Sequence, residues 1–162
     1  MGKLLAVLYI SVILSLTTQG LCAKDVIEIR ATGLTYQRYI GPNLSWKLFA
    51  SEFIKKGEEY FEAKKLYIEN ISKGIKINAE KGHYSVKEKR FLLKGQIKLQ
   101  TEKEGEVQTE ELHFYPEKDL IEAPGIVVIR KGTMEISGEG LTYRLSMGDF
   151  KLHRRAKAQF KL

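Results

Sequence analysis

Cysteine, histidine and tryptophan are scarce in this chain of 162 residues, and their scarcity excludes several kinds of site. Cys22 is the only cysteine, so no disulfide can form within the chain. The three histidines, His83, His113 and His153, are far apart, and the first two occupy nearly equivalent positions in an internal repeat. We attribute His83 and His113 to the repeat, and the sequence predicts neither a metal site nor a cofactor.

Patterns typical of a catalytic site are also missing. The sequence has no nucleophile motif and no phosphate-binding loop. A dinucleotide-binding turn is followed by a helix, but no helix is predicted after residues 138–140 (Gly-Glu-Gly). Glu110 and Glu111 are adjacent, so on a strand they point to opposite faces and cannot act as a pair of catalytic carboxylates. We therefore predict that this protein is not an enzyme.

The balance of charge is basic, at +7 for the whole chain. A basic surface favours anionic partners such as nucleic acid, phospholipid headgroups or a phosphorylated glycolipid. The compartment must decide among these three classes, and residues 1–23 carry the information about it.

Residues 1–23 have the anatomy of an export segment. Lys3 precedes an apolar run from Leu4 to Leu16, and a short polar stretch follows. Extended to Ala23, the run is about 20 residues long, which is enough to span a bilayer. The segment is therefore a cleaved signal peptide or a retained single-span anchor. In both cases residues 24–162 leave the cytoplasm, which argues against nucleic acid as a partner.

Residues 24–162 form one predicted domain with an internal repeat of about 30 residues. Residues 74–84 and 105–115 both open on glycine, run extended and reach tyrosine at the same offset, and a third copy spans residues 132–143. A charged turn and a second extended run follow each of the first two copies. Two strands and two turns per unit predict an all-β fold of stacked antiparallel strands.

Residues 45–61 fit two patterns. Their apolar residues follow helical spacing at Trp46, Phe49, Ala50, Phe53 and Ile54. However, Gly57 interrupts the run and the flanking segments are strands. We predict a strand, a turn at residues 56–57 and a second strand, because context commonly overrides a local signal.

Alternation of apolar and polar residues is clearest from Phe91 to Gln100, which predicts a sheet with one solvated face. By contrast, residues 126–129 (Ile-Val-Val-Ile) are apolar at every position, and we expect both of their faces to be covered. The inward-facing apolar residues make either a dry core or, in an open roll, a groove for acyl chains. The groove candidates are Ile75, Ile77, Phe91, Leu93, Ile97, Leu99, Val107, Leu112, Phe114, Ile129, Met134 and Ile136.

The last predicted strand runs from Phe150 to Leu162 and alternates, with a break at Arg154. Neither a helix nor a proline follows to cover it, so it is a candidate open edge. Such a strand is either solvated by its lysines or used to add a strand from a partner. The candidates for partner contact are Phe150, Leu152, Arg154, Ala156, Ala158 and Phe160.

Several short motifs, in order and spacing, carry a resemblance that covers most of residues 25–160. They are residues 46–50 (Trp-Lys-Leu-Phe-Ala), 78–84 (Asn-Ala-Glu-Lys-Gly-His-Tyr), 92–95 (Leu-Leu-Lys-Gly), 108–112 (Gln-Thr-Glu-Glu-Leu) with Tyr115, and 137–141 (Ser-Gly-Glu-Gly-Leu). This pattern resembles the LptC type of the periplasmic β-jellyroll proteins of lipopolysaccharide export, which are related to LptA and to OstA-like domains.

The resemblance implies a twisted open β-jellyroll in the periplasm, held to the inner membrane by a single N-terminal helix and without catalytic residues. It also implies that lipopolysaccharide from the inner-membrane ABC transporter passes along the apolar groove to a periplasmic LptA-like bridge protein, through head-to-tail pairing of edge strands. Two alternatives stay open: a soluble LptA-like bridge, if residues 1–23 are cleaved, and an anchored module that binds only protein. A glycolipid-processing enzyme of the envelope is disfavoured because no acid–base pair is present.

Overall fold

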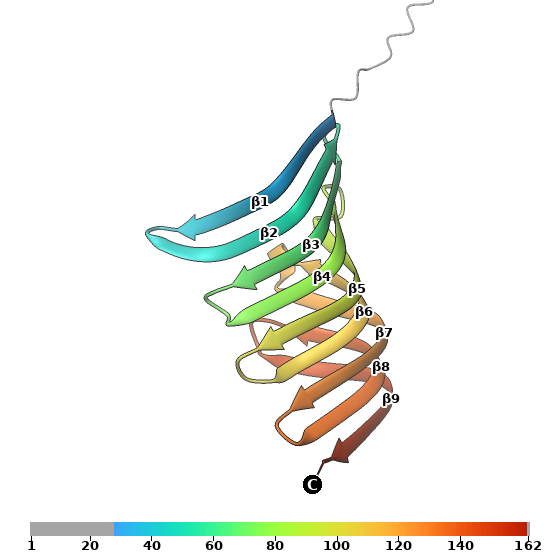
Figure 1. Ribbon diagram of the computed structural model, residues 1–162. Coiled ribbons are helices and arrows are strands. Elements are labelled where there is room, and N and C mark those ends of the chain that lie inside the picture. Colours follow the sequence, from blue (N-terminus) through green and yellow to red (C-terminus); the bar gives the residue numbers. More distant parts are fainter. Residues whose placement is uncertain (1–27, 162) are drawn as a thin grey trace, which may run out of the picture.

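The computed structural model describes residues 28–161, and these form a single sheet of nine antiparallel strands (Figure 1). Each strand pairs with the next one in the sequence, so the strand order is β1 to β9 without a crossover. A short 3-10 helix, η1, precedes β7. The elements are β1 (Glu28–Ile40), β2 (Asn43–Lys56), β3 (Tyr60–Asn70), β4 (Ile75–Ser85), β5 (Arg90–Thr101), β6 (Gly105–Tyr115), η1 (Pro116–Lys118), β7 (Leu120–Lys131), β8 (Met134–Arg144) and β9 (Asp149–Phe160).

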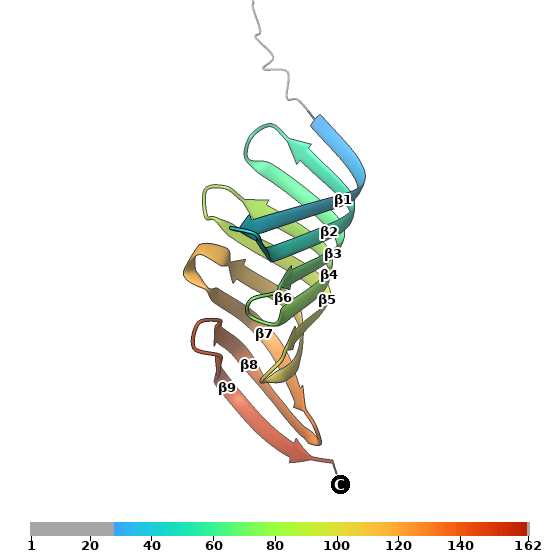
Figure 2. The ribbon, with the colours of Figure 1, turned by 90° about the vertical axis from the view of Figure 1, so that its left-hand side faces the viewer.

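The predicted all-β class and the repeat are both confirmed. Each predicted repeat is one pair of strands, β4–β5, β6–β7 or β8–β9, and the pairs begin at Ile75, Gly105 and Met134. The hairpins are stacked along the long axis of the molecule, as Figure 2 shows. The N-terminal segment predicted at residues 1–23 lies outside the described residues, and residues 28–161 include no helix with the length and apolar character of a bilayer span.

Residues 45–61 are strand, turn and strand, as predicted from their context. The helical spacing of their apolar residues has a structural cause. Trp46, Leu48 and Ala50 pack on the core with a period of two, and the next such residue is Phe53. The inward-facing residues therefore have even numbers up to Ala50 and odd numbers from Phe53 onward. In the sequence, a strand with such a change of phase has the same spacing of apolar residues as a helix.

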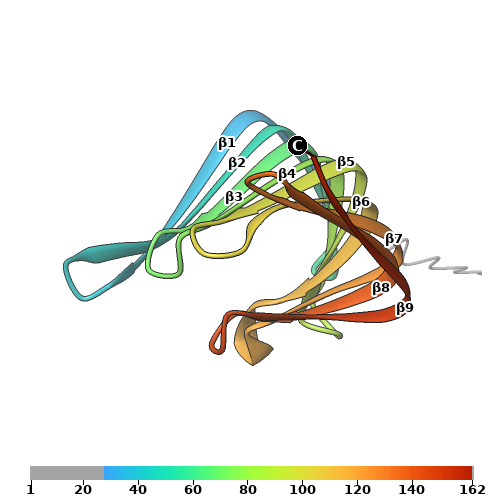
Figure 3. The ribbon, with the colours of Figure 1, turned by 90° about the horizontal axis from the view of Figure 1, so that it is seen from below.

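A line of bends crosses the sheet and folds it lengthwise. Residues with positive φ interrupt strands at Gly33, Lys65, Gln96, Gly140 and Arg155. The pairing register shifts within most neighbouring strand pairs, as expected for β-bulges, which bend and twist a strand. Seen from below (Figure 3), the bent strands form two arms that face each other. We call these the two arms of the sheet.

The core lies between the two arms, and the outer face carries no second layer in the described part of the chain. Val127 and Ile129 are 0% and 5% exposed, whereas Ile126, from the opposite face of the same strand, is 75% exposed. The prediction that both faces of residues 126–129 are covered is therefore wrong. A single folded sheet buries only its inner face.

Both outermost strands are edges within residues 28–161, because β1 pairs only with β2 and β9 only with β8. The last strand occupies Asp149–Phe160. The break predicted at Arg154 coincides with a bulge: the β8–β9 register shifts between Ser137 and Glu139, and Arg155 has a φ of 53°.

Candidate functional site

One lateral row of cross-strand neighbours is aliphatic on every strand from β2 to β9. We call it the aliphatic row. Its central member Leu99 is fully buried, its first member Leu48 is half-buried, and its last member Ala158 is exposed. The row therefore begins and ends near the two edges of the sheet. Its members are Leu48, Ile68, Ile77, Leu99, Val107, Ile129, Ile136 and Ala158.

A second lateral row, in the other arm, is mostly aromatic, and we call it the aromatic row. Neighbouring ring centroids lie 4.7 Å apart between Tyr84 and Phe91, and 6.1 Å apart between Phe91 and Phe114. Cross-strand aromatic pairs stabilise a sheet beyond the area that they bury. The members are Phe61, Tyr84, Phe91, Phe114, Ile121, Tyr143 and Phe150.

The two arms touch through Trp46, the only tryptophan of the chain. Its ring centroid lies 5.3 Å from that of Phe114. Trp46 belongs to β2 and Phe114 to β6, which are not neighbours in the sheet. This contact therefore closes the folded sheet over its own core.

Nine of the twelve predicted groove residues are buried in this conformation. Each of the nine is at most 5% exposed: Ile75, Ile77, Leu93, Ile97, Leu99, Val107, Leu112, Phe114 and Ile129. The other three, Phe91, Met134 and Ile136, are partly exposed. The middle of the aliphatic row is thus closed, and two of the three partly exposed residues, Met134 and Ile136, lie on β8 beside the edge strand β9.

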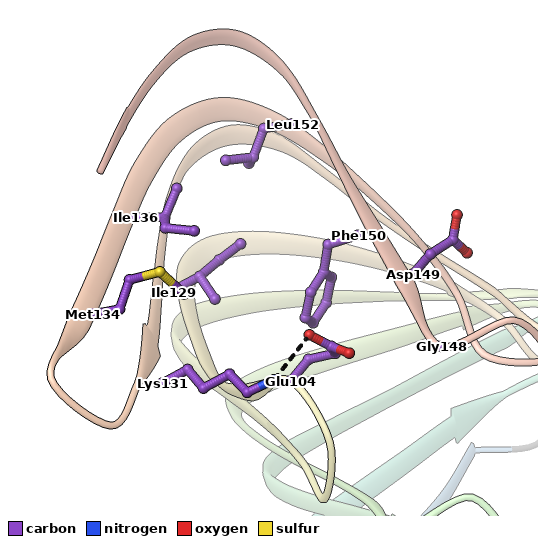
Figure 4. Close-up of a pocket in the computed structure, with 9 residues that line it drawn as sticks. All are labelled: Glu104, Ile129, Lys131, Met134, Ile136, Gly148, Asp149, Phe150 and Leu152. Carbon is purple, nitrogen blue, oxygen red and sulfur yellow. Dashed lines mark ion pairs between the residues drawn. The ribbon is translucent and has the colours of Figure 1, made fainter. Parts of the chain in front are cut away.

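A pocket of about 420 Å³ opens at that end of the roll (Figure 4). Its wall is apolar and its rim is charged, with Lys131 and Glu104 forming an ion pair of 3.6 Å. Lys131 ends β7 and Glu104 lies in the β5–β6 turn. The apolar lining residues are Ile129, Met134, Ile136, Phe150 and Leu152, and Asp149 completes the rim.

Tyr143 packs against the lining residue Phe150, with ring centroids 4.3 Å apart. Burial raises the pKa of the Tyr143 hydroxyl, and the nearby charges of Glu104 and Asp149 add to the effect. The site therefore combines an apolar interior with carboxylates and an ammonium group at its mouth. This chemistry suits the apolar end of an amphiphile.

The structure divides the predicted edge residues of β9 into three groups. Phe150 and Leu152 line the pocket. Ala158 and Phe160 pair with Ile136 and Met134 on the inner face and are exposed, and Ala156 is also exposed. Arg154 instead forms an ion pair of 3.1 Å with Glu139 across the β8–β9 pair.

Sequence reasoning missed Trp46, Phe61, Tyr84, Ile121 and Tyr143 as residues of the inner face. The tyrosine shared by the repeats was the available signal, since Tyr84 and Tyr143 both lie in the aromatic row. In the middle repeat that signal misleads, because Phe114 occupies the row and Tyr115 is adjacent to it on the strand. Counting from the repeat glycine fails because the glycine stands at different offsets: Gly74 precedes β4, whereas Gly105 is the first residue of β6.

His113 has a structural partner on each ring nitrogen. Arg90 donates to Nδ1 at 2.9 Å, so the proton lies on Nε2, which donates to Glu111 at 2.9 Å. This hydrogen bond, together with the nearby Lys94, holds the pKa of Glu111 below its usual value. No group of metal-ligating side chains occurs among residues 28–161.

Comparison with protein families shows which family the chain matches. The family model described as lipopolysaccharide-assembly, LptC-related, matches residues 43–161, which extend from the start of β2 to one residue past the end of β9. The comparison with curated proteins found no match.

Proposed function

Because this chain belongs to the family of LptC-related lipopolysaccharide-assembly proteins, and so to the machinery of lipopolysaccharide transport, we propose a specific role for it in that transport. It receives lipopolysaccharide from the inner-membrane ABC transporter and passes it along the inner face of its sheet. The recipient is a periplasmic LptA-like bridge protein, and the protein itself performs no chemistry on the lipid.

The observation that carries this proposal is the continuity of the two rows. The aliphatic row reaches from β2 to β9 and the aromatic row from β3 to β9, so apolar side chains face each other along nearly the whole roll. Exposing an acyl chain to water costs about 0.8 kcal/mol per methylene, or about 10 kcal/mol for a chain of 14 carbons. A continuous apolar path removes that barrier at every strand.

Passage of lipid requires the arms to separate, because the middle of the roll is dry. The contact to be broken is that between Trp46 and Phe114. An aromatic pair is worth about 0.5–1.5 kcal/mol beyond its buried area. That part of the cost is small beside the free energy of shielding one acyl chain, and the acyl chain covers the apolar area that opening exposes, so lipid can take the place of the closing contact.

Edge strands give the proposed path its continuation. We place the transporter next to β1 and the bridge protein next to β9, each adding a strand to an edge that is open within residues 28–161. The pocket beside β9 is then the exit of the path. The proposed location is the inner membrane, with residues 1–23 as the anchor and the sheet in the periplasm. Removal of that segment would instead make the protein a soluble bridge.

A second candidate function is a protein-interaction module that carries no lipid. The dryness of the nine buried groove residues favours it, because a packed interior has no room for a ligand. This module would use its edges in the same way.

Photocrosslinking in cells distinguishes the two candidates. A crosslinker replaces Phe91 or Ile136, which are partly exposed and therefore tolerant of change. Lys98, on the outer face of the same strand as Phe91, is the matched control. Lipopolysaccharide adducts at Phe91 and Ile136 that need an active transporter, with none at Lys98, are expected. A folded protein without adducts at either inner position would leave the interaction module.

A further inference from the structure

Positive charge is concentrated on the C-terminal edge of the sheet. Residues 28–148 contain twenty basic and eighteen acidic side chains, so the sheet before β9 is nearly neutral. Residues 149–161 contain one acidic side chain, Asp149 at the pocket rim, and five basic ones: Lys151, Arg154, Arg155, Lys157 and Lys161. The open strand β9 is therefore distinct in charge from the strands that precede it.

Three of these five side chains already have counter-charges on β8. Glu139 lies 3.1 Å from Arg154 and 3.9 Å from Arg155, and Glu135 lies 3.4 Å from Lys161.

The remaining two have none within 4 Å among residues 28–161. Lys151 is paired across the strands with Thr142, and Lys157 with Ser137. Thus β8 leaves these two lysines of the edge without a carboxylate.

Both lysines point away from the pocket. Lys151 lies between Phe150 and Leu152, which line the pocket, so its own side chain is on the outer face. Lys157 pairs with Ser137, the neighbour of the lining residue Ile136, and is on the same outer face. A lipid whose chains occupy the pocket is on the opposite side of the sheet, which favours a protein strand over a lipid phosphate as the counter-charge.

The bulge at Arg155 divides the edge into two straight segments, residues 149–153 and 156–160. Each segment has apolar side chains on the inner face and one of these two lysines on the outer face. In a ladder, the residue directly opposite each lysine comes from the added strand, and opposite charges in such positions are stabilising.

We propose that the edge of β9 selects a partner strand with apolar side chains on its inner face and Asp or Glu on its outer face. This inference rests on the proposed function, since it assumes that β9 takes up a partner strand. It adds the chemistry by which that partner is recognised.

The same charges reject a second copy of this chain. Two β9 strands placed edge to edge would bring lysine opposite lysine, which is destabilising. The strand β1 offers only Glu28 as an acidic residue, and Arg30 and Lys56 already pair with it. End-to-end stacking of identical copies therefore leaves Lys151 and Lys157 unmatched.

Labelled nine-residue peptides test the selection. Three peptides share the same apolar residues, which alternate with Glu, Lys or Ser, and their binding to the full-length chain in detergent is measured by fluorescence anisotropy. We expect the Glu peptide to bind about 2- to 30-fold more tightly than the Ser peptide, from two cross-strand ion pairs. High salt should reduce this difference, because exposed pairs are screened.

Charge reversal on β9 provides a second test. The double variant Lys151→Glu and Lys157→Glu should prefer the Lys peptide, and circular dichroism checks its fold. The matched control, Lys87→Glu with Lys98→Glu, reverses two exposed lysines away from β9 and should keep the preference for the Glu peptide.

Each other outcome overturns the proposal in a recognisable way. Equal binding of the three peptides would leave strand addition in place and remove the selection by charge. An unchanged preference in the double variant, accompanied by loss of binding to anionic phospholipid vesicles, would assign the lysines to lipid. Binding of none of the peptides would also remove strand addition at β9 from the proposed function, whereas lipid crosslinking at Phe91 and Ile136 would still test the path.

Discussion

The contact between Trp46 and Phe114 can be measured as a coupling free energy. Both residues are replaced by leucine, singly and together, and unfolding in urea is followed by circular dichroism. Leucine keeps the interior apolar, so each single variant should lose about 1–3 kcal/mol, within the range of ordinary core substitutions. A domain of this size has about 5–15 kcal/mol of stability, so the double variant should still fold.

The expected coupling follows from the geometry. The ring centroids are 5.3 Å apart at an interplanar angle of 38°, and Phe114 is 1% exposed. Aromatic pairs of this kind are worth about 0.5–1.5 kcal/mol in double-mutant cycles. The loss in the double variant should therefore be smaller than the sum of the single losses by that amount.

A second cycle supplies the control. Trp46 and Phe150 are both aromatic residues of the inner face, but they lie on β2 and β9. Within residues 28–161, the ring of Trp46 contacts Phe114 and the ring of Phe150 contacts Tyr143, and the two rings do not contact each other. Their variants should be additive within about 0.3–0.5 kcal/mol. Coupling no larger than this for Trp46 and Phe114 would show that the arms do not close in solution. The account of a closed interior would then be wrong.

Three further predictions concern the sheet itself, and urea unfolding measures each of them. Gly105→Ala should cost at least about 1–3 kcal/mol, because Gly105 has a φ of +86° and an added Cβ would lie 2.2 Å from a carbonyl oxygen of β7; a neutral effect would mean that β6 and β7 do not approach each other as described. Val127→Thr should cost well over 1 kcal/mol and its neighbour Ile126→Thr less than about 0.5 kcal/mol, and equal costs would contradict a single-layer sheet. The pKa of Glu111 is lowered by its hydrogen bond with His113, so its contribution to stability is present above the ordinary pKa of glutamate and is lost as the pH falls through the lowered value; Glu111→Gln should flatten the acid limb of the stability curve, and an unchanged limb would count against this pair.

The stacked antiparallel strands could be predicted because their signals are local. Alternation with a period of two, turn residues and a repeat of about 30 residues all act over short stretches of chain, and antiparallel neighbours in sequence commonly pair. The strand at residues 45–56 was also predicted, although its apolar residues follow helical spacing. The repeats on both sides of it carried that prediction.

The bends could not be predicted in the same way. Lys65, Gln96 and Arg155 have positive φ, which no sequence rule assigns to lysine, glutamine or arginine. Each bend changes which residues face inward. Tyr115 was grouped with Tyr84, although Phe114 occupies the aromatic row, because the repeat was counted from glycines that stand at different offsets from β4 and β6. Whether both faces of residues 126–129 are covered depends on whether a second layer packs on the outer face of the sheet. The pattern of apolar residues along one strand does not carry that information.

The amino-acid sequence by itself determined that the chain makes a meander of stacked strands with one apolar face and a basic last strand, since period, turns and charge are properties of neighbouring residues. Only the tertiary structure decided that the arms close through Trp46 and Phe114, that most groove candidates are buried and that the open pocket lies beside β9. Those features depend on contacts between β2 and β6 and among β7, β8, β9 and the β5–β6 turn. Such contacts arise from how far each bulge bends its strand, and that bending is set by the packing of the whole sheet.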